Sequence, residues 1–314
     1  MQIVYWNIDQ ELKREAEENY RTRFAVNLKD CQPLEIIREL TFDGVVPAIT
    51  LTDLHRVFDY VEKYFLKKKI AGTGLEVGAG PLTFSSVLAT RDNVQKVYGV
   101  EICRPIVELL APKIISYVLG GQSEKVIGVV GSFDDLELPD QSVDFVFDFF
   151  SLHHSLDITV TLKELQRVLK PGGFVLCFDK ARPDSYTQQD LEELLDKVYP
   201  ESYNLQFGLP PERKITRRLN GEREYRLRDW HQAFRNAGFS IFEHHNLQQT
   251  KGKGVSGIIK HILSLAPPSV QKIFNFFLPL PKQNHKFIVS WDNRVFVRPV
   301  DAFRKEISLM IAYV

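Results

Sequence analysis

The sequence has few cysteines, and they are scattered. Cys31, Cys103 and Cys177 are the three, and no two of them have the CxxC spacing of a zinc or redox site. The disulfide frameworks of small secreted proteins also need more cysteines than these. We therefore expect no metal, and a reducing, cytoplasmic environment.

Long apolar runs and an excess of one charge are missing too. No apolar stretch approaches the roughly 18 residues of a membrane-spanning helix. The N-terminal residues reach Asp9 without the apolar core of a signal peptide. The 40 Lys and Arg residues balance 40 Asp and Glu residues, so no overall field attracts the chain to nucleic acid. We expect a cytoplasmic protein with no nucleic-acid partner.

Short apolar runs alternate with amphipathic segments in the middle of the chain. Strands that alternate with helices predict a doubly wound α/β fold, in which a parallel sheet is covered on both faces. A Lys-Pro-Gly-Gly turn at 170–173 separates the last helix–strand pair. The predicted strands are Gly74–Val77, Val97–Glu101, Val126–Val130, Val143–Asp148 and Gly173–Phe178, and the predicted helices are 82–90, 104–118, 158–169, 187–198 and 227–237.

Two flanking segments differ from this α/β core, which we place at 70–248. Residues 1–69 are charged and amphipathic, and we expect them to form a helical lid. Residues 249–314 form a C-terminal helical and β cap in this prediction. From His244 to Trp291 the chain has no Asp or Glu but six lysines among apolar residues. This stretch could cover the active site, form a homodimer interface or contact an anionic membrane surface.

A cluster of basic residues precedes the predicted helix 227–237. Such a patch could bind a phosphate or carboxylate, or it could be a solvated face with acidic neighbours. The cluster consists of Arg213, Lys214, Arg217, Arg218, Arg223, Arg226 and Arg228.

A glycine-rich turn at 75–82 (LEVGAGPL) follows the first core strand. Gly78 and Gly80 let the backbone pass close to a ligand. Thr83 stands where the dinucleotide pattern GxGxxG requires its last glycine, which disfavours a nicotinamide-dependent oxidoreductase. Glu101 ends the next strand about 20 residues later, where an acid holds ribose hydroxyls. The alternative is a tight turn without a ligand, followed by a solvated acid at a helix start.

Four segments in this order resemble class I S-adenosylmethionine-dependent methyltransferases. They are 75–82, 131–144 before the fourth strand, 145–154, and 162–173, the helix and turn before the fifth strand. The resemblance covers about 70–180 and is greatest to the small-molecule branch that includes ubiquinone methyltransferases. It implies a mostly parallel, seven-stranded Rossmann-like sheet, with S-adenosylmethionine as cofactor and S-adenosylhomocysteine as product.

The resemblance also implies which residues hold the cofactor. Glu76 would reach the methionine amino group, Glu101 the ribose, and Ile102 would face the adenine. Two positions depart from the family pattern: Leu82 replaces a third glycine, and Ser132 stands where an Asp commonly binds the adenine amino group. The other implied contacts are Gly78, Ala79, Gly80 and Pro81 in the turn, Ser132, Phe133 and Asp134 at the adenine edge, and Asp148 and Phe149 near the sulfonium.

His153 and His154 follow the fourth strand and are the candidate general bases. Alternatively, they only begin a helix. A sulfonium methyl is already a strong electrophile, so alignment and exclusion of water should supply most of the catalysis. A base is needed only when the acceptor carries a proton.

The activity we expect is methyl transfer to an oxygen or nitrogen of a small molecule, such as a natural-product intermediate, a sugar or a quinone-like ring. The alternatives are a catalytically inactive partner subunit that binds S-adenosylmethionine and the less favoured oxidoreductase.

Overall fold

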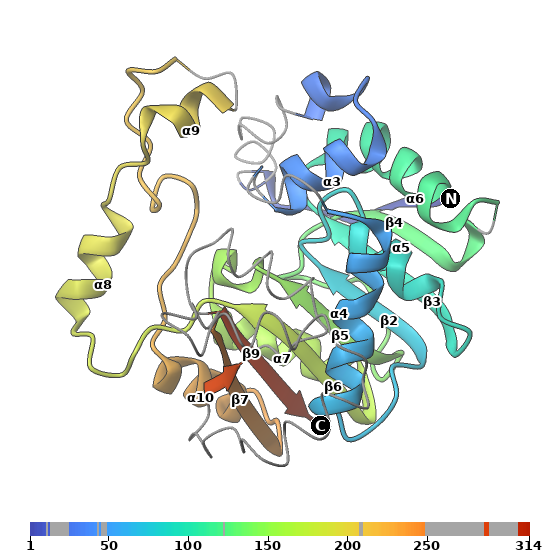
Figure 1. Cartoon of the computed structure of the whole chain (residues 1–314). Helices are drawn as coiled ribbons and strands as arrows, with labels where there is room; N and C mark the ends of the chain where they lie inside the picture. Colours follow the sequence, from blue (N-terminus) through green and yellow to red (C-terminus); the bar gives the residue numbers. More distant parts are fainter. Residues whose placement is uncertain are drawn as a thin grey trace, which may run out of the picture.

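A computed structural model describes residues 1–10, 12, 25–42, 44, 49–121, 123–206, 210–248, 286–288 and 307–314. Its centre is a nine-stranded sheet in the order β1-β4-β3-β2-β5-β6-β9-β7-β8, with helices on both faces (Figure 1). The predicted doubly wound, mostly parallel α/β fold is confirmed. The predicted strand number was too small, because each edge of the sheet carries an additional strand.

The direction of the sheet order reverses at β2 (Gly72–Val77). On one side of β2 lie β3 (Val94–Glu101) and then β4 (Val126–Val130), and on the other lie β5 (Val143–Phe149) and then β6 (Leu169–Asp179). All of these neighbours are parallel. In such sheets a crevice opens beyond the carboxyl ends of the strands where the order reverses. The glycine turn after β2 therefore lies at the expected ligand position.

Four further strands complete the sheet, and three of them (β1, β8 and β9) come from the flanks. β1 (Gln2–Tyr5) pairs with β4 at one edge. β9 (Ile307–Tyr313) is antiparallel to both β6 and β7 (Ile241–Gln248), and β8 (Lys286–Ile288) pairs with β7 at the other edge. The segment 1–69 is therefore not wholly helical, and the predicted boundaries at 69 and 248 do not enclose the whole sheet.

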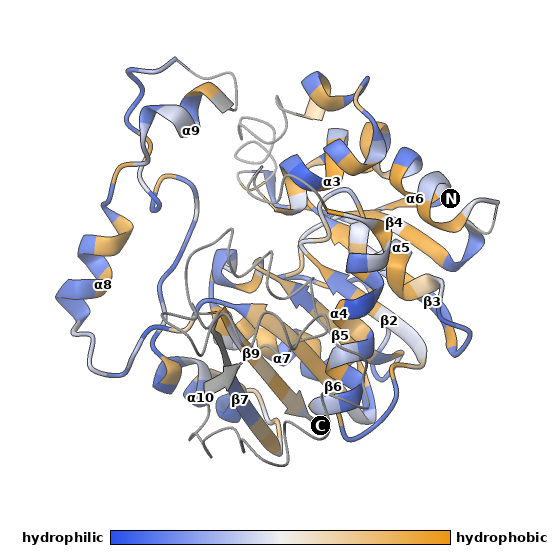
Figure 2. Ribbon diagram, viewed as in Figure 1, coloured by the Kyte–Doolittle hydropathy of each residue, from blue (hydrophilic) through white to orange (hydrophobic). Residues whose placement is uncertain are grey.

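Consecutive strand residues point to opposite faces, so the sheet has two cores. Phe145 and Phe147 join the cluster that includes α4 and α5, whereas Val146 joins the cluster that includes α7 and α10. Figure 2 shows β4, β5 and β6 as largely hydrophobic, as expected for strands buried on both faces. The α-helices of the described residues are α3 (Pro33–Thr41), α4 (Leu51–Tyr64), α5 (Thr83–Ala89), α6 (Ala111–Leu119), α7 (Ile158–Val168), α8 (Gln188–Leu195), α9 (Glu201–Gln206) and α10 (Leu227–Asn236). A π-helical turn at Ile106–Leu110 precedes α6.

The predicted turn at 170–173 lies inside β6. Val143 of β5 pairs with Leu169, and the next registered pair is Phe145 with Phe174. The residues between them loop out of the ladder, and Gly172 adopts a φ of 73° there. Residues 170–173 therefore interrupt the regular ladder as predicted, but they form a bulge within β6 and not a turn before it.

Between β6 and α10, over residues 180–226, the chain runs outside the sheet. We call this segment the excursion. Figure 1 shows α8 and α9 standing outside the sheet on this excursion. Much of the basic cluster lies here and has acidic partners. Arg217 pairs with Glu224, and Arg218 pairs with Glu192 and Asp196. These two arginines therefore fit the acidic-neighbour alternative.

None of the described helices is long and apolar enough to cross a membrane. The acid-free stretch 244–291 lies outside the described residues, apart from 244–248 and 286–288. Its role as a cap, a dimer interface or a membrane contact therefore stays a prediction. The lid role of the N-terminal segment also stays a prediction.

Candidate active site

The two glycines of the turn serve different purposes. Gly78 and Gly80 have φ values of 58° and 50°, in the left-handed region that favours glycine. A Cβ at Gly78 would lie 2.3 Å from the Ser151 side chain, whereas one at Gly80 would meet no protein atom within 4 Å. Gly78 thus allows the turn to pack against the loop after β5, and Gly80 keeps the pocket open.

Leu82 explains how the turn tolerates a departure from the family pattern. It adopts a φ of 58° although it carries a Cβ, and its side chain is fully buried. The space it fills lies over Gly99, where an added Cβ would come within 2.9 Å of the leucine Cγ. Burying a leucine side chain contributes about 1.5–3 kcal/mol, which offsets a backbone strain of about 1–3 kcal/mol.

Glu101 connects the glycine turn to the tip of β3. Its carboxylate accepts hydrogen bonds from the backbone N–H of Gly80 at 2.9 Å and of Cys103 at 2.8 Å. Two carboxylate oxygens together offer about four acceptor positions, so capacity for two ribose hydroxyls remains. The turn and the acid that the sequence paired are thus in direct contact.

Glu76 is buried at the end of β2 and lines the pocket. It accepts hydrogen bonds from the backbone N–H and the hydroxyl of Ser85 on α5. Burial raises the pKa of this carboxyl to about 8, because the charged form is poorly solvated there. A cationic group bound beside Glu76 would favour the ionised carboxylate.

Glu76→Gln is expected to flatten the pH dependence of stability in the ligand-free protein. A carboxyl whose pKa rises from 4.5 to about 8 on folding contributes stability that is present below pH 4.5 and is lost as the pH rises to about 8. The wild type should therefore lose on the order of 4 kcal/mol more than the variant between pH 5 and pH 9. Chemical denaturation followed by circular dichroism measures this, and parallel curves for the two proteins would contradict it.

Eight of the predicted site residues line one pocket at the carboxyl ends of the strands. They come from β2 and its turn, and from the end of β5 and the loop that follows it. The wall also includes residues of α3, α5, the excursion after β6, and β9. The eight are Glu76, Gly78, Ala79, Gly80, Pro81, Phe149, His153 and His154.

The other predicted cofactor residues are not among those that line this pocket. The Asp134 carboxylate accepts from Leu156 N–H at 3.3 Å and from the Thr161 hydroxyl, which fixes the start of α7. Asp148 is fully buried and accepts from Ser151 N–H at 3.0 Å. Cofactor contacts of all predicted residues stay predictions; those outside the pocket wall are Glu101, Ile102, Ser132, Phe133, Asp134 and Asp148.

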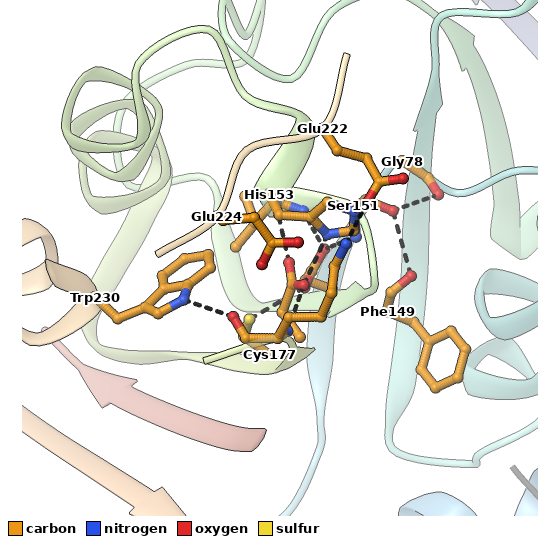
Figure 3. A network of polar contacts seen from close by, with 12 residues as sticks. Gly78, Phe149, Ser151, His153, Cys177, Glu222, Glu224 and Trp230 are labelled. Atoms are coloured by element: carbon orange, nitrogen blue, oxygen red, sulfur yellow. Dashed lines mark hydrogen bonds and ion pairs between the residues drawn. The ribbon is translucent and has the colours of Figure 1, made fainter. Parts of the chain in front are cut away.

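His153 is part of a network of polar contacts in the pocket (Figure 3). It is buried, and its Nδ1 lies 2.7 Å from Asp179 Oδ1 at the end of β6. Burial raises the pKa of Asp179 to about 6, although nearby Lys180 opposes the shift. Above that pH the carboxylate accepts the Nδ1 proton, which leaves His153 Nε2 as the basic nitrogen.

Within the described part of the chain, Asp148, Cys177 and Asp179 form a group with metal-ligand chemistry, their ligand atoms lying within 4.8 Å of one another. Burial raises the pKa of the Cys177 thiol, which donates to Asp148 Oδ2 at 3.1 Å. A protonated thiol is a poor ligand, because metals bind the thiolate. The group therefore fits a hydrogen-bonded cluster, and the expected absence of a metal stays a prediction.

The excursion after β6 supplies pocket residues that the sequence did not reveal. Among them are Lys180, Tyr199, Tyr203 and Glu222. Lys180 directly follows the strand tip, so its position beyond a predicted strand was an available signal. Trp230 of α10 donates its indole N–H to the Lys180 carbonyl at 2.8 Å and fixes that segment (Figure 3). Nothing in the sequence marks Tyr199, Tyr203 or Glu222.

Comparison with known families agrees with this geometry. Residues 75–177 match the family model described as a methyltransferase domain. Over these residues, about a third of the chain, the sequence is similar to methyltransferase domains. The matched region runs from β2 to β6 and holds both the glycine turn and His153.

The curated relatives of this chain act on different kinds of molecule, as their names state. A ubiquinone/menaquinone biosynthesis C-methyltransferase of Caulobacter sp. strain K31 is 30% identical over 134 residues, 42% of this chain and 50% of that protein. A glycine/sarcosine/dimethylglycine N-methyltransferase of Actinopolyspora halophila is 39% identical over 72 residues, 23% of this chain and 13% of that protein. The matches thus span half or less of the length of these relatives.

Among solved structures, a methyltransferase of Thermotoga maritima, titled a possible histamine N-methyltransferase, aligns with 94% of this chain and 98% of its own at 18% identity and a TM-score of 0.47.

Proposed function

We propose that this protein transfers the methyl group of S-adenosylmethionine to a hydroxyl or amine of a small molecule. The observation that carries the proposal is the position of His153, which is paired with Asp179 in the same pocket as the glycine turn. A binding site alone would not need a basic nitrogen held in one orientation. The pair therefore argues against a catalytically inactive partner subunit.

The residues of the turn suit the cofactor. Glu76 would hold the positively charged amino group, and Glu101 the ribose hydroxyls. Gly80 leaves the space between them unobstructed by a side chain. When bound, S-adenosylmethionine supplies an electrophilic methyl on a positively charged sulfur.

The chain's own residues would handle the acceptor proton. His153 Nε2 would take the proton from the attacking hydroxyl or amine, and the Asp179 carboxylate would stabilise the resulting imidazolium. The excursion after β6 covers this side of the pocket and would exclude water. Alignment of the acceptor with the methyl–sulfur bond would supply much of the rate.

Calorimetric titration tests the cofactor half of the proposal. S-adenosylhomocysteine should bind with about 1:1 stoichiometry, and NAD should not bind. Transfer of a labelled methyl group to a panel of hydroxyl and amine acceptors tests the catalytic half. No heat with S-adenosylhomocysteine would refute the function, and binding without any transfer would favour an inactive subunit.

A further inference from the structure

A short segment crosses the pocket beside the candidate base. We call residues 221–227 the strap. Its Arg223 N–H donates to the His153 carbonyl at 2.9 Å, and its Leu227 N–H donates to the Arg182 carbonyl at 2.9 Å. The strap is therefore attached both to the loop that carries the base and to the chain just beyond β6.

Two carboxylates of the strap point inward, and they have different surroundings. Glu222 and Glu224 are both buried, whereas the intervening Arg223 bonds the Gly221 carbonyl at the surface. Arg182 and Arg217 both pair with Glu224. Burial alone would raise the pKa of Glu224, but Arg182, Lys180 and Arg217 lower it to about 2. Glu224 thus anchors the strap, and it is not part of the described pocket wall.

Glu222 is part of the pocket wall and faces the base. Its Oε2 lies 4.0 Å from His153 Nε2, and Lys180 Nζ donates to the same carboxylate oxygen. Asn220 Nδ2 lies 3.4 Å from Oε1. Lys180 and Asn220 therefore orient the carboxylate beside the nitrogen that we expect to accept the substrate proton.

An ionised carboxylate at this position restricts which acceptors fit. It only accepts hydrogen bonds, and a single hydroxyl has one proton, which His153 would take. The oxygen of that hydroxyl and the Glu222 carboxylate would then be two hydrogen-bond acceptors side by side, which is unfavourable. A substrate with a second donor can instead donate a hydrogen bond to Glu222. Two hydroxyls on neighbouring carbons meet this requirement, one directed at His153 and the other at Glu222.

The excursion also offers a surface for a ring. The rings of Tyr199 and Tyr203 stack with centroids 4.1 Å apart, and both residues line the same pocket. Rigid aromatic faces suit a flat or cyclic substrate.

We propose that Glu222 is a specificity-determining residue that accepts a hydrogen bond from a second hydroxyl of the acceptor. The preferred substrates are then rings with two neighbouring hydroxyls. This inference rests on the proposed function.

Matched pairs of small probes test the inference. Catechol is compared with phenol, and cis-cyclohexane-1,2-diol with cyclohexanol, by NMR titration of the protein with and without S-adenosylhomocysteine. In the wild type we expect at least one diol to bind about tenfold more tightly than its single-hydroxyl partner, since hydrogen bonds to charged groups are strong. The two pairs distinguish aromatic from saturated rings.

Variants of the two strap carboxylates separate substrate recognition from anchoring. Glu222→Ala should abolish the diol preference, and Glu222→Gln should retain part of it because an amide oxygen still accepts. Glu224→Ala is the matched control: it removes an anchor of the strap and should keep the preference. A preference that is absent in the wild type, or unchanged in Glu222→Ala, would overturn the inference. Equal loss in Glu222→Ala and Glu224→Ala would do the same.

The failure of this inference is distinguishable from failure of the proposed function. Binding of S-adenosylhomocysteine is measured separately by calorimetry. A protein that binds it and methylates single-hydroxyl acceptors equally well would retain the proposed function but lose this inference. A protein that does not bind it would lose the proposed function first.

Discussion

Replacing His153 with alanine is expected to slow methyl transfer by about 10²–10⁴-fold, the usual contribution of a positioned general base. The imidazole is the group that Asp179 orients at 2.7 Å, and alanine cannot take the acceptor proton. Affinity for S-adenosylhomocysteine should change little, because His153 lies on the acceptor side of the proposed arrangement. Single-turnover transfer of a labelled methyl group and calorimetry measure the two quantities separately.

His154→Ala is the matched control for this prediction. The two imidazole rings are neighbours, with centroids 4.3 Å apart, and both residues line the pocket. We assign the base to His153 because its Nδ1 lies 2.7 Å from Asp179 Oδ1. We expect His154→Ala to retain most of the transfer rate. A larger loss in His154→Ala than in His153→Ala would reverse the assignment of the base.

The parts of the fold that sequence predicted are those set by local patterns. The run Val126–Val130 became β4 with the predicted bounds, because a short β-branched run between turns has few alternatives. The contact between Gly80 and Glu101 also followed from local features, since adjacent parallel strands end at the same edge of the sheet. Local order along the chain was therefore sufficient to predict that the glycine turn and this acid lie together.

The acceptor end depends on contacts that no local pattern encodes. Asp179 meets His153 only because β6 pairs with β5 in the observed register. Glu222 reaches the base through an excursion whose path is set by ion pairs of the strap. The apolar run Ile307–Tyr313 has the composition of a buried strand, but its place between β6 and β7 is a property of the whole sheet. These relations require the tertiary structure.

Gly80→Val is expected to abolish measurable binding of S-adenosylhomocysteine while the fold persists. A Cβ at this position meets no protein atom within 4 Å, so the new side chain would project into the pocket rather than into the core. Two methyl groups would then occupy space that we assign to the cofactor. The positive φ of 50° adds backbone strain of about 1–2 kcal/mol, which the domain should tolerate. Calorimetry measures the binding, and circular dichroism verifies the fold.

Gly120→Val separates lost space from backbone strain. Gly120 also has a positive φ, of 60°, and an added Cβ there also meets nothing within 4 Å. It ends α6 and is not among the residues that line the pocket. Because the two substitutions share strain and an open surrounding, they should lower thermal stability by comparable amounts, but only Gly80→Val should remove binding. Unchanged affinity in Gly80→Val would mean that the cofactor does not occupy the space above the glycine turn, since the side chain has no other place to go.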